Sequence, residues 1–300
     1  MICDLIHDDC FEFLKNTEYN FDLTYLDPPF NQNKNYNSHD DKMDPIEYWK
    51  WMKDVSNLVY EKTNFGGSIY FMQREKNVKE VITVLEDSNW IFQNLIVWKK
   101  KSSAVPGTYK YGKHYQIIVF ATKGPKPQVF NKLRIDPPLL VTEKYKRENG
   151  MYVTDVWDDI RELTSGYFAG EEPLRLPNGE RLHNQQSPIQ LLLRIILSSS
   201  KPGDFILDPF SGTATTNIVS RQLNRNSICI EKDDLYFEHC VKRLNEFRNV
   251  DKIDRFKDGY KYTENLDNIW GFPINYTVLH SPQYALFEKK VKYNKSHKSK

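Results

Sequence analysis

The stretch DFILDPFSGTATTNIVSRQLNRNSICIEKDDLY, residues 204–236, decides the fold class. It holds a short run of β-forming residues, a turn at Gly212, a helical segment and a second β-forming run that ends at Glu231. A strand, a helix and a strand within so short a segment predict a βαβ unit with two parallel strands.

The same alternation of strands and helices extends along most of the chain. Further strands are predicted at FDLTYLD (21–27), GGSIYFM (66–72), WIFQNLIVW (90–98) and YQIIVFATKG (115–124). Helices are predicted at 45–60, 187–200 and 233–247. The pattern predicts an α/β fold with a doubly wound, mostly parallel sheet.

Composition is typical of an ordinary soluble globular protein. The 300 residues are 39% hydrophobic, 14% aromatic and 27% charged, which allows one large domain or two small ones. No run of about 18 apolar residues occurs, and the first residues carry acids where a signal peptide needs bases. We therefore expect a cytoplasmic protein without a membrane span.

The four cysteines, Cys3, Cys10, Cys229 and Cys240, form no C-x-x-C pair. This spacing is atypical of a zinc ribbon or a disulfide framework. We expect reduced thiols and no metal site.

The segment LTYLDPPF, residues 23–30, ends a predicted strand in a rigid acidic corner. Ligands of doubly wound sheets bind outside the carboxyl ends of the strands, so Asp27 falls where chemistry usually occurs. Pro28 and Pro29 fix the direction of the Asp27 carboxylate and of nearby carbonyl groups, and Phe30 adds a flat apolar face. Such acceptors beside a ring suit a planar substrate that carries an amino group. For Asp-Pro-Pro alone, a simple tight turn remains an equal alternative.

The turn in the βαβ unit favours a nucleoside ligand. Glu231 closes the second strand about 20 residues after the turn, where such units place the acid that binds ribose hydroxyls. Gly212 stands without the other glycines of G-x-G-x-x-G, so a nucleoside without phosphates is favoured over a dinucleotide. S-adenosylmethionine is such a ligand.

Together these motifs resemble the amino-group DNA methyltransferases of the β arrangement, in which a D-P-P-[YFW] motif precedes the cofactor motif. The two motifs read DPPF at 27–30 and DPFSGTATT at 208–216. Supporting segments, in the family's order, are DDCFEFLK (8–15), DVWDDI (155–160), HNQQSPIQLLLRII (183–196) and LNRNSICIEKDDLYFEHCVKRL (223–244). The resemblance covers most of residues 1–250.

The resemblance implies a Rossmann-like methyltransferase fold with circularly permuted motif order and S-adenosylmethionine as cofactor. It implies methylation of a flipped-out adenine in double-stranded DNA within a restriction-modification system, and leaves open a cognate endonuclease and a homodimer as partners. The implied catalytic residues are Asp27, Pro28, Pro29 and Phe30. The implied cofactor-binding residues are Asp9, Cys10, Gln186, Ser187, Pro188, Asp208, Pro209, Phe210, Gly212, Thr213 and Glu231.

Some positions depart from the family pattern or have a simpler explanation. Ser187 replaces the usual lysine of Q-K-P, and Ala214 replaces the second glycine of the late loop. Loss of the lysine is expected to weaken the hold on the methionyl carboxylate, unless Gln186 and the Ser187 hydroxyl compensate for it. Asp9 suits a helix N-cap nearly as well as a cofactor contact.

The net charge is only +2, but the segment 98–115 holds five lysines and no acid. Lysines interleaved with tyrosines suit phosphate contact and base stacking, although a solvated basic loop is the alternative. The predicted DNA contacts are Lys99, Lys100, Lys101 and Lys113.

Four regions are expected from these motifs. Residues 1–124 form the catalytic half and 183–249 the cofactor-binding half of the methyltransferase domain. Residues 125–182, of weak periodicity, form an inserted target-recognition region. Residues 250–300 form an ordered appendage that ends in a disordered lysine-rich tail.

Other functions are weighed against this one. A nicotinamide oxidoreductase should carry a fuller glycine fingerprint and leaves DPPF unexplained. A noncatalytic DNA-binding subunit has no need for both the acceptor corner and the cofactor loop. Cytosine N4 and RNA adenine are closer alternatives, and Asp27 favours adenine because the family's cytosine enzymes tend to have serine there.

Overall fold

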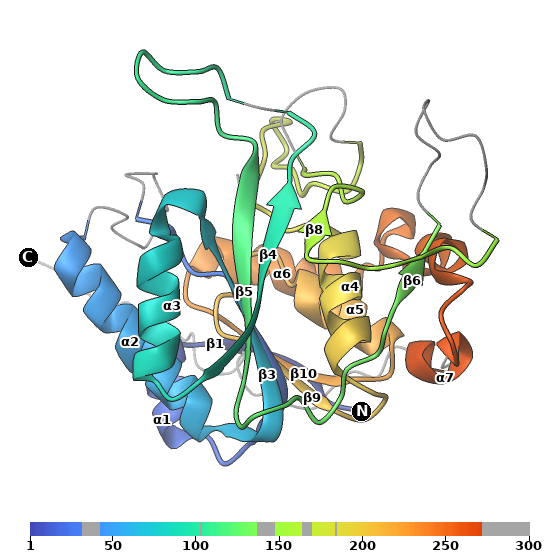
Figure 1. Ribbon diagram of the computed structural model, residues 1–300, viewed down its shortest axis with the longest axis horizontal. Helices are drawn as coiled ribbons and strands as arrows, with labels where there is room; N and C mark the ends of the chain where they lie inside the picture. The colour runs from blue at the N-terminus through green and yellow to red at the C-terminus, as the bar shows by residue number, and fades with distance from the viewer. Residues whose placement is uncertain (32–42, 103, 137–147, 164–169, 184, 272–300) are drawn as a thin grey trace, which may run out of the picture.

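A sheet of eight strands runs through the centre of the molecule in the order β1-β10-β9-β2-β3-β5-β4-β8 (Figure 1). The computed structural model describes residues 1–31, 43–102, 104–136, 148–163, 170–183 and 185–271. The strands of this sheet are β1 (Cys3–His7), β2 (Phe21–Leu26), β3 (Thr63–Arg74), β4 (Ile91–Lys99), β5 (Tyr115–Thr122), β8 (Val156–Trp157), β9 (Phe205–Asp208) and β10 (Asn226–Glu231). Only the β3–β5 and β4–β5 pairs of this sheet are antiparallel, so the predicted, mostly parallel sheet is confirmed.

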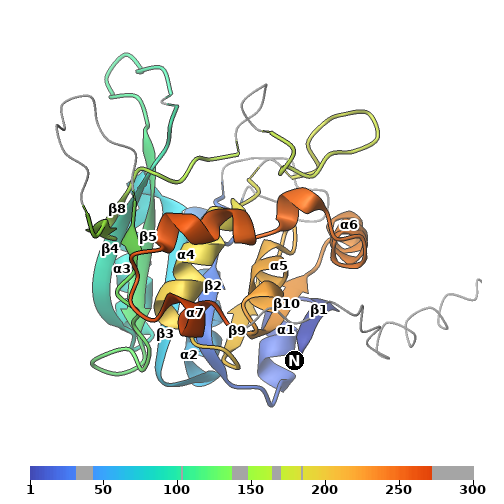
Figure 2. The same ribbon diagram turned by 90° about the vertical axis from the view of Figure 1, so that its right-hand side faces the viewer.

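Helices cover both faces of the sheet, as a doubly wound fold requires. One buried cluster joins the sheet to α1 (Cys10–Asn16), α2 (Pro45–Glu61) and α3 (Val78–Asp87). On the other face lie α4 (Ile189–Ser199), α5 (Thr215–Gln222) and α6 (Asp234–Asn245) (Figure 2). Within the described ranges, no helix is both long enough and apolar enough to cross a bilayer.

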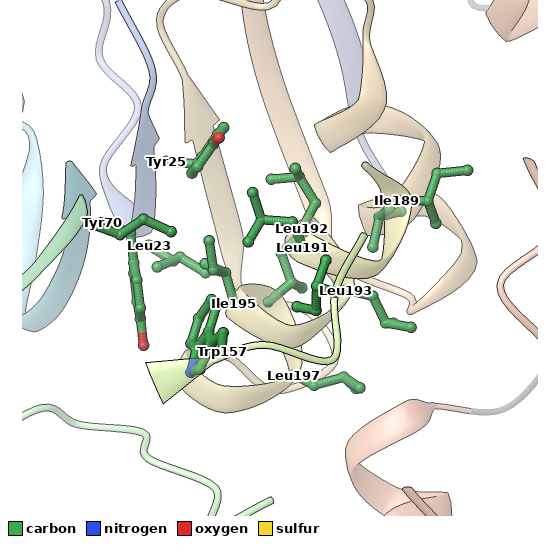
Figure 3. Packing of buried hydrophobic residues seen from close by; sticks show 14 of the residues in the cluster. Leu23, Tyr25, Tyr70, Trp157, Ile189, Leu191, Leu192, Leu193, Ile195 and Leu197 are labelled. Carbon is green, nitrogen blue, oxygen red and sulfur yellow. The ribbon is translucent and has the colours of Figure 1, made fainter. Parts of the chain in front are cut away.

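Helix α4 is mostly apolar and is buried along nearly its whole surface; Gln190 alone among its residues is half-exposed. Its leucines and isoleucines pack against the sheet and against Trp157 (Figure 3). On its outer side the same cluster includes Tyr260 and Trp270 from the C-terminal segment. A helix that is hydrophobic around its circumference needs such a second covering layer.

The segment after α6 is therefore a part of the core. It forms η3 (Asn249–Asp251), η4 (Asp254–Tyr260) and α7 (Leu266–Trp270). It also binds the insertion, because Thr263 Oγ1 accepts a hydrogen bond from the Arg134 amide (2.8 Å) and Lys261 pairs with Asp136 (3.2 Å). The segment predicted as an appendage is described up to residue 271 and belongs to the core, and the predicted disordered tail lies outside the described residues.

The segment 125–182, predicted to be an insertion, also contributes to the main sheet. Its strands β6 (Arg134–Ile135) and β7 (Met151–Tyr152) form a separate two-stranded sheet, whereas β8 extends the central sheet beside β4. The sheet thus places one edge of the insertion next to the end of β4, where the basic segment begins.

Candidate active site

Three acids end three neighbouring parallel strands on the carboxyl edge of the sheet. Asp27 follows β2, Asp208 ends β9 and Glu231 ends β10, and these strands are adjacent in the order β10-β9-β2. All three line a single cavity of about 310 Å³. The parallel topology alone brings together residues that are up to 204 positions apart in the chain.

The acidic corner is held from several sides by hydroxyl groups. The Tyr25 hydroxyl and the Ser187 hydroxyl donate to Asp27 Oδ2 at 3.2 and 3.1 Å. The hydroxyls of Tyr25 and Ser187 lie 2.9 Å apart. The Tyr48 hydroxyl donates to the Pro29 carbonyl at 2.8 Å. These contacts hold both ends of the corner and leave the Asp27 carboxylate facing the cavity.

Burial makes the charge state of Asp27 sensitive to its surroundings. Loss of solvent and the neighbouring Asp208 carboxylate raise the pKa of Asp27 to about 7. The hydroxyls of Ser187 and Tyr25 and the Lys100 ammonium group act in the opposite direction. Asp27 is therefore a well-oriented acceptor whose ionisation falls close to neutral pH.

The turn after β9 is tied to strand ends by its own backbone amides. Asp208 accepts hydrogen bonds from the Phe210 amide (3.1 Å) and from Thr216 Oγ1 (2.5 Å). Gly212 has a positive φ of 55° and donates its amide to Glu231 Oε2 at 2.7 Å. Ala214 also has a positive φ, 57°, and is fully buried. The small residues allow the backbone to pass close to the cavity.

Glu231 is oriented for a ligand with hydroxyl groups. Its Oε1 accepts the Asp233 amide at 2.9 Å, while Oε2 accepts the Gly212 amide. Each carboxylate oxygen has a further lone pair that can accept a hydrogen bond. Burial raises the pKa of Glu231 to about 7, and the charges of Asp233 and Asp208 add to that effect. A ligand that donates hydrogen bonds here stabilises the ionised form.

Nearly all the predicted catalytic and cofactor-binding residues line this cavity. They are Asp9, Cys10, Asp27, Pro28, Pro29, Phe30, Gln186, Ser187, Asp208, Pro209, Phe210, Gly212, Thr213 and Glu231. Pro188 is the exception among the described residues; it precedes α4, where its carbonyl accepts the Leu191 amide at 3.0 Å.

Two of these residues have structural partners as well. Asp9 is the N-cap of α1, as its alternative assignment predicted, because its side chain accepts a hydrogen bond from the Phe11 amide (2.9 Å). It also forms an ion pair with Lys232 (2.9 Å). The Gln186 side chain accepts the Leu174 amide (2.9 Å) and donates to the Glu172 carbonyl (3.2 Å). Gln186 thus holds the insertion against the cavity wall, and its contact with a cofactor stays a prediction.

The four lysines predicted to contact DNA have different surroundings. Lys99 is exposed, and Lys113 pairs with Glu75 at 3.0 Å. The ammonium group of Lys101 donates to the Asp158 carbonyl. Lys100 is half-buried with Nζ over the Trp98 ring, and desolvation lowers its pKa to about 7. Lys100 is therefore close enough to Asp27 to influence its charge and is not fully exposed on the outer surface. The DNA contacts of all four lysines stay predictions.

A second cavity of about 430 Å³ adjoins the first. Both are lined by Gln185, Gln186 and Ser187, so they meet beside Asp27. The second cavity is lined by Met72, Arg74, Glu75, Trp98, Lys100, Ser102, Lys113, Tyr115, Gln116, Glu162, Leu163 and Arg181, in addition to the three shared residues. Nε and Nη2 of Arg181 are buried and have no hydrogen-bond partner within the part of the chain that the structure describes.

Sequence reasoning missed several residues of the first cavity, among them Tyr25, His183, Asp233 and Tyr236. Tyr236 lies five residues after Glu231 within the segment 223–244 that resembles the family, so a signal for it existed. Tyr25 lies within a buried apolar strand, where a tyrosine reads as core. Among the described residues, no group of three His, Cys, Asp or Glu side chains is arranged to hold a metal ion.

Comparison with known proteins gives a family-level match. A family model described as "DNA methylase" matches residues 21–242. The type II methyltransferase M.HpaI of Haemophilus parainfluenzae is 32% identical over 253 residues, which cover 83% of this chain and 77% of the relative. The type II methyltransferase M.HinfI of Haemophilus influenzae is 27% identical over 266 residues, covering 81% and 68% of the two chains.

Solved structures show the same fold. The M1.HpyAVI–SAM complex has a TM-score of 0.55 at 24% identity and covers 82% of this chain and 100% of its own. The cytosine-N4-specific PvuII DNA methyltransferase has a TM-score of 0.59 at 17% identity and covers 86% and 91%. The Rossmann-like methyltransferase fold predicted from the motifs is thereby confirmed.

Proposed function

We propose that this chain, which belongs to the DNA methylase family, transfers the methyl group of S-adenosylmethionine to N6 of adenine in duplex DNA. One observation carries the proposal: two cavities share Ser187, and the Ser187 hydroxyl, together with that of Tyr25, orients the Asp27 carboxylate that lines the first cavity. A methyl donor and an acceptor base need two binding sites with one reacting centre between them. A restriction-modification system is the proposed setting, in accord with the type II relatives.

The first cavity suits S-adenosylmethionine in charge and in hydrogen-bond acceptors. Asp208 and Glu231 are buried and Asp27 is half-buried, and loss of solvent raises the pKa of each of these carboxyl groups. A sulfonium cation offsets such charges, and ribose hydroxyls fit the remaining lone pairs of Glu231. When bound, the cofactor supplies an electrophilic methyl group on sulfur.

The corner acts on the target amino group by accepting its hydrogens. The adenine amine is a poor nucleophile because its lone pair is delocalised into the ring. If the Asp27 carboxylate and the Pro28 carbonyl accept its two N–H groups, the nitrogen can become pyramidal and direct its lone pair at the methyl carbon. Transfer of the methyl group would leave the cofactor as a neutral thioether and the nitrogen with one surplus proton. Asp27 lies where it can receive that proton.

The second cavity suits the target nucleotide. A paired base is inaccessible in the stack, so the target must be flipped out of the duplex. Arg74, Lys100 and Arg181 line the cavity and offer cations to the flanking phosphates, while Trp98 and Met72 give it an apolar part. The insertion at 125–182 supplies the proposed contacts to base edges.

Asp27 favours adenine over cytosine, since the family's cytosine enzymes tend to have serine at this position. The test uses methyl-labelled S-adenosylmethionine with duplex DNA, single-stranded DNA and RNA, followed by nucleoside analysis. Label in N6-methyladenine from the duplex is the expected result. Label in N4-methylcytosine overturns the choice of base, and absence of label from every nucleic acid overturns the proposal.

A further inference from the structure

The described residues between β4 and β5, 100–102 and 104–114, form the two arms of a ribbon that projects beyond the body of the molecule (Figure 1). The Lys100 amide donates to the His114 carbonyl (2.8 Å) and the Ala104 amide donates to the Lys113 carbonyl (2.8 Å). A bridge between Gly107 and Lys110 closes the turn. The ribbon therefore has defined arms and a defined tip.

The two arms approach each other closely at Gly112. A Cβ atom there would lie 2.0 Å from the Ala104 carbonyl oxygen, so any side chain would force the arms apart. Gly112 therefore permits the close approach of the two arms.

The tip presents apolar side chains to solvent. Tyr109 is 95% exposed, Tyr111 is 99% exposed and Val105 is 91% exposed. Scattered exposed apolar residues are common, but large rings gathered on a projecting turn are typical of a contact surface. Lys110 lies between the two tyrosines and is exposed as well. A cation between two aromatic rings complements nucleic acid, which offers negative charge on its phosphates and flat faces on its bases.

The foot of the ribbon lies at the proposed nucleotide cavity. Lys100, Ser102, Lys113 and Tyr115 from its arms line the second cavity, which meets the first beside Asp27. A nucleotide that enters this cavity must leave the duplex on the side where the ribbon projects. The gap that remains in the base stack then faces the ribbon.

We propose that Tyr109 and Tyr111 insert into the duplex where the target base has left, and so hold that base out of the stack. This inference rests on the proposed function, because only a base-flipping reaction leaves such a gap. Aromatic or apolar wedges between bases stabilise distorted duplexes, and stacking on a ring depends little on sequence. The tyrosines are therefore positioning residues that act on the substrate, and the insertion keeps the task of reading the sequence.

The test compares a Tyr109→Ala/Tyr111→Ala variant with the wild type on two duplexes. One duplex has a matched target base, and the other has an abasic site opposite the target, which makes flipping easy. We expect kcat/KM on the matched duplex to fall by about 10- to 100-fold, the range of one or two lost stacking contacts. On the abasic duplex the loss should shrink to less than about threefold, and 2-aminopurine at the target position should lose its fluorescence increase in the variant.

Two control variants separate stacking from other effects. Tyr109→Phe/Tyr111→Phe keeps both rings and should retain near wild-type rates. Phe65→Ala removes another exposed ring, 74% exposed, near the opposite end of the sheet and should have no effect. Unchanged S-adenosylmethionine affinity of each variant verifies folding.

An equal loss on both duplexes, an unchanged rate, or an altered choice of methylated sites overturns the inference. A wild type that transfers no methyl group to any DNA overturns the proposed function itself, which the wild-type arm of the same experiment reveals.

Discussion

Replacing Glu231 with glutamine should weaken S-adenosylmethionine binding and remove most of the pH dependence that Glu231 causes. In the free protein, burial and neighbouring acids raise the pKa of this carboxyl group to about 7. Ribose hydroxyls bind best to the ionised form, because a carboxylate accepts stronger hydrogen bonds than a carboxylic acid. Protons and ligand therefore compete, and affinity falls as the pH falls through 7.

The magnitude follows from the pKa. With a pKa near 7, about nine-tenths of the carboxylate is ionised at pH 8 and about one-tenth at pH 6, so the Kd should rise ~10-fold across this interval, or ~1.4 kcal/mol. At pH 8 glutamine loses the charge-assisted bonds, which costs ~1.5–3 kcal/mol and raises the Kd ~10- to 150-fold. At pH 6 binding to the wild type is already weakened, so the ratio of the variant Kd to the wild-type Kd should be about ten times smaller than at pH 8.

Isothermal titration calorimetry at pH 6, 7 and 8 measures this ratio directly. Other carboxylates and groups of the ligand titrate in both proteins, so the comparison isolates Glu231. Glu18→Gln, on the exposed surface and outside the cavity, provides a matched loss of one charge. A ratio that does not change with pH would refute the role assigned to Glu231.

Three further predictions concern the corner and the core. Asp27→Asn should lower single-turnover methyl transfer by about 10²- to 10⁴-fold with less than about a tenfold change in cofactor Kd; comparable losses in both would show a general defect. Lys100→Met should raise the pKa of Asp27, since the ammonium group favours the ionised carboxylate, and so shift the rising limb of the pH–rate profile to higher pH; a shift downward would contradict this. Asp251→Ala should reduce the free energy of unfolding in urea by about 3–5 kcal/mol, because the buried Arg243 loses its ion pair (2.6 Å), and an unchanged midpoint would show that the pair adds little.

Local patterns in the sequence account for the features that were predicted. The strand, turn, helix and strand around Gly212 have short-range signals, and parallel strands bring their carboxyl ends to one edge. Asp27, Asp208 and Glu231 could therefore be assigned to a common site without coordinates. Their spacing along the chain was no obstacle, because topology supplied the proximity.

Side-chain direction could not be predicted in this way. Tyr25 and Ser187 are 162 residues apart, and their hydroxyl contact depends on how α4 is seated against the sheet. Lys100 belongs to a run of lysines that looks uniformly solvent-directed, yet it turns toward Trp98 while Lys99 points outward. In a strand, neighbours alternate between faces, so a basic run at a strand end divides between two environments.

The C-terminal segment shows a similar limit. Its aromatic, aperiodic sequence predicted an ordered appendage, but its role in covering α4 depends on tertiary packing. The run of leucines and isoleucines in α4 was the available signal, because a mostly apolar helix requires packing partners on more than one side. Tyr260 and Trp270 are part of that partner layer.

The most direct test of the central claim is a crystal structure of the chain with a nonreactive S-adenosylmethionine analogue and duplex DNA that contains its target site. We predict a flipped adenine whose amino nitrogen lies at about 3 Å from both the Asp27 carboxylate and the Pro28 carbonyl. The analogue should lie in the first cavity, with its ribose hydroxyls hydrogen-bonded to Glu231. A target base that stays stacked, or an amino group bound away from Asp27, would contradict the account.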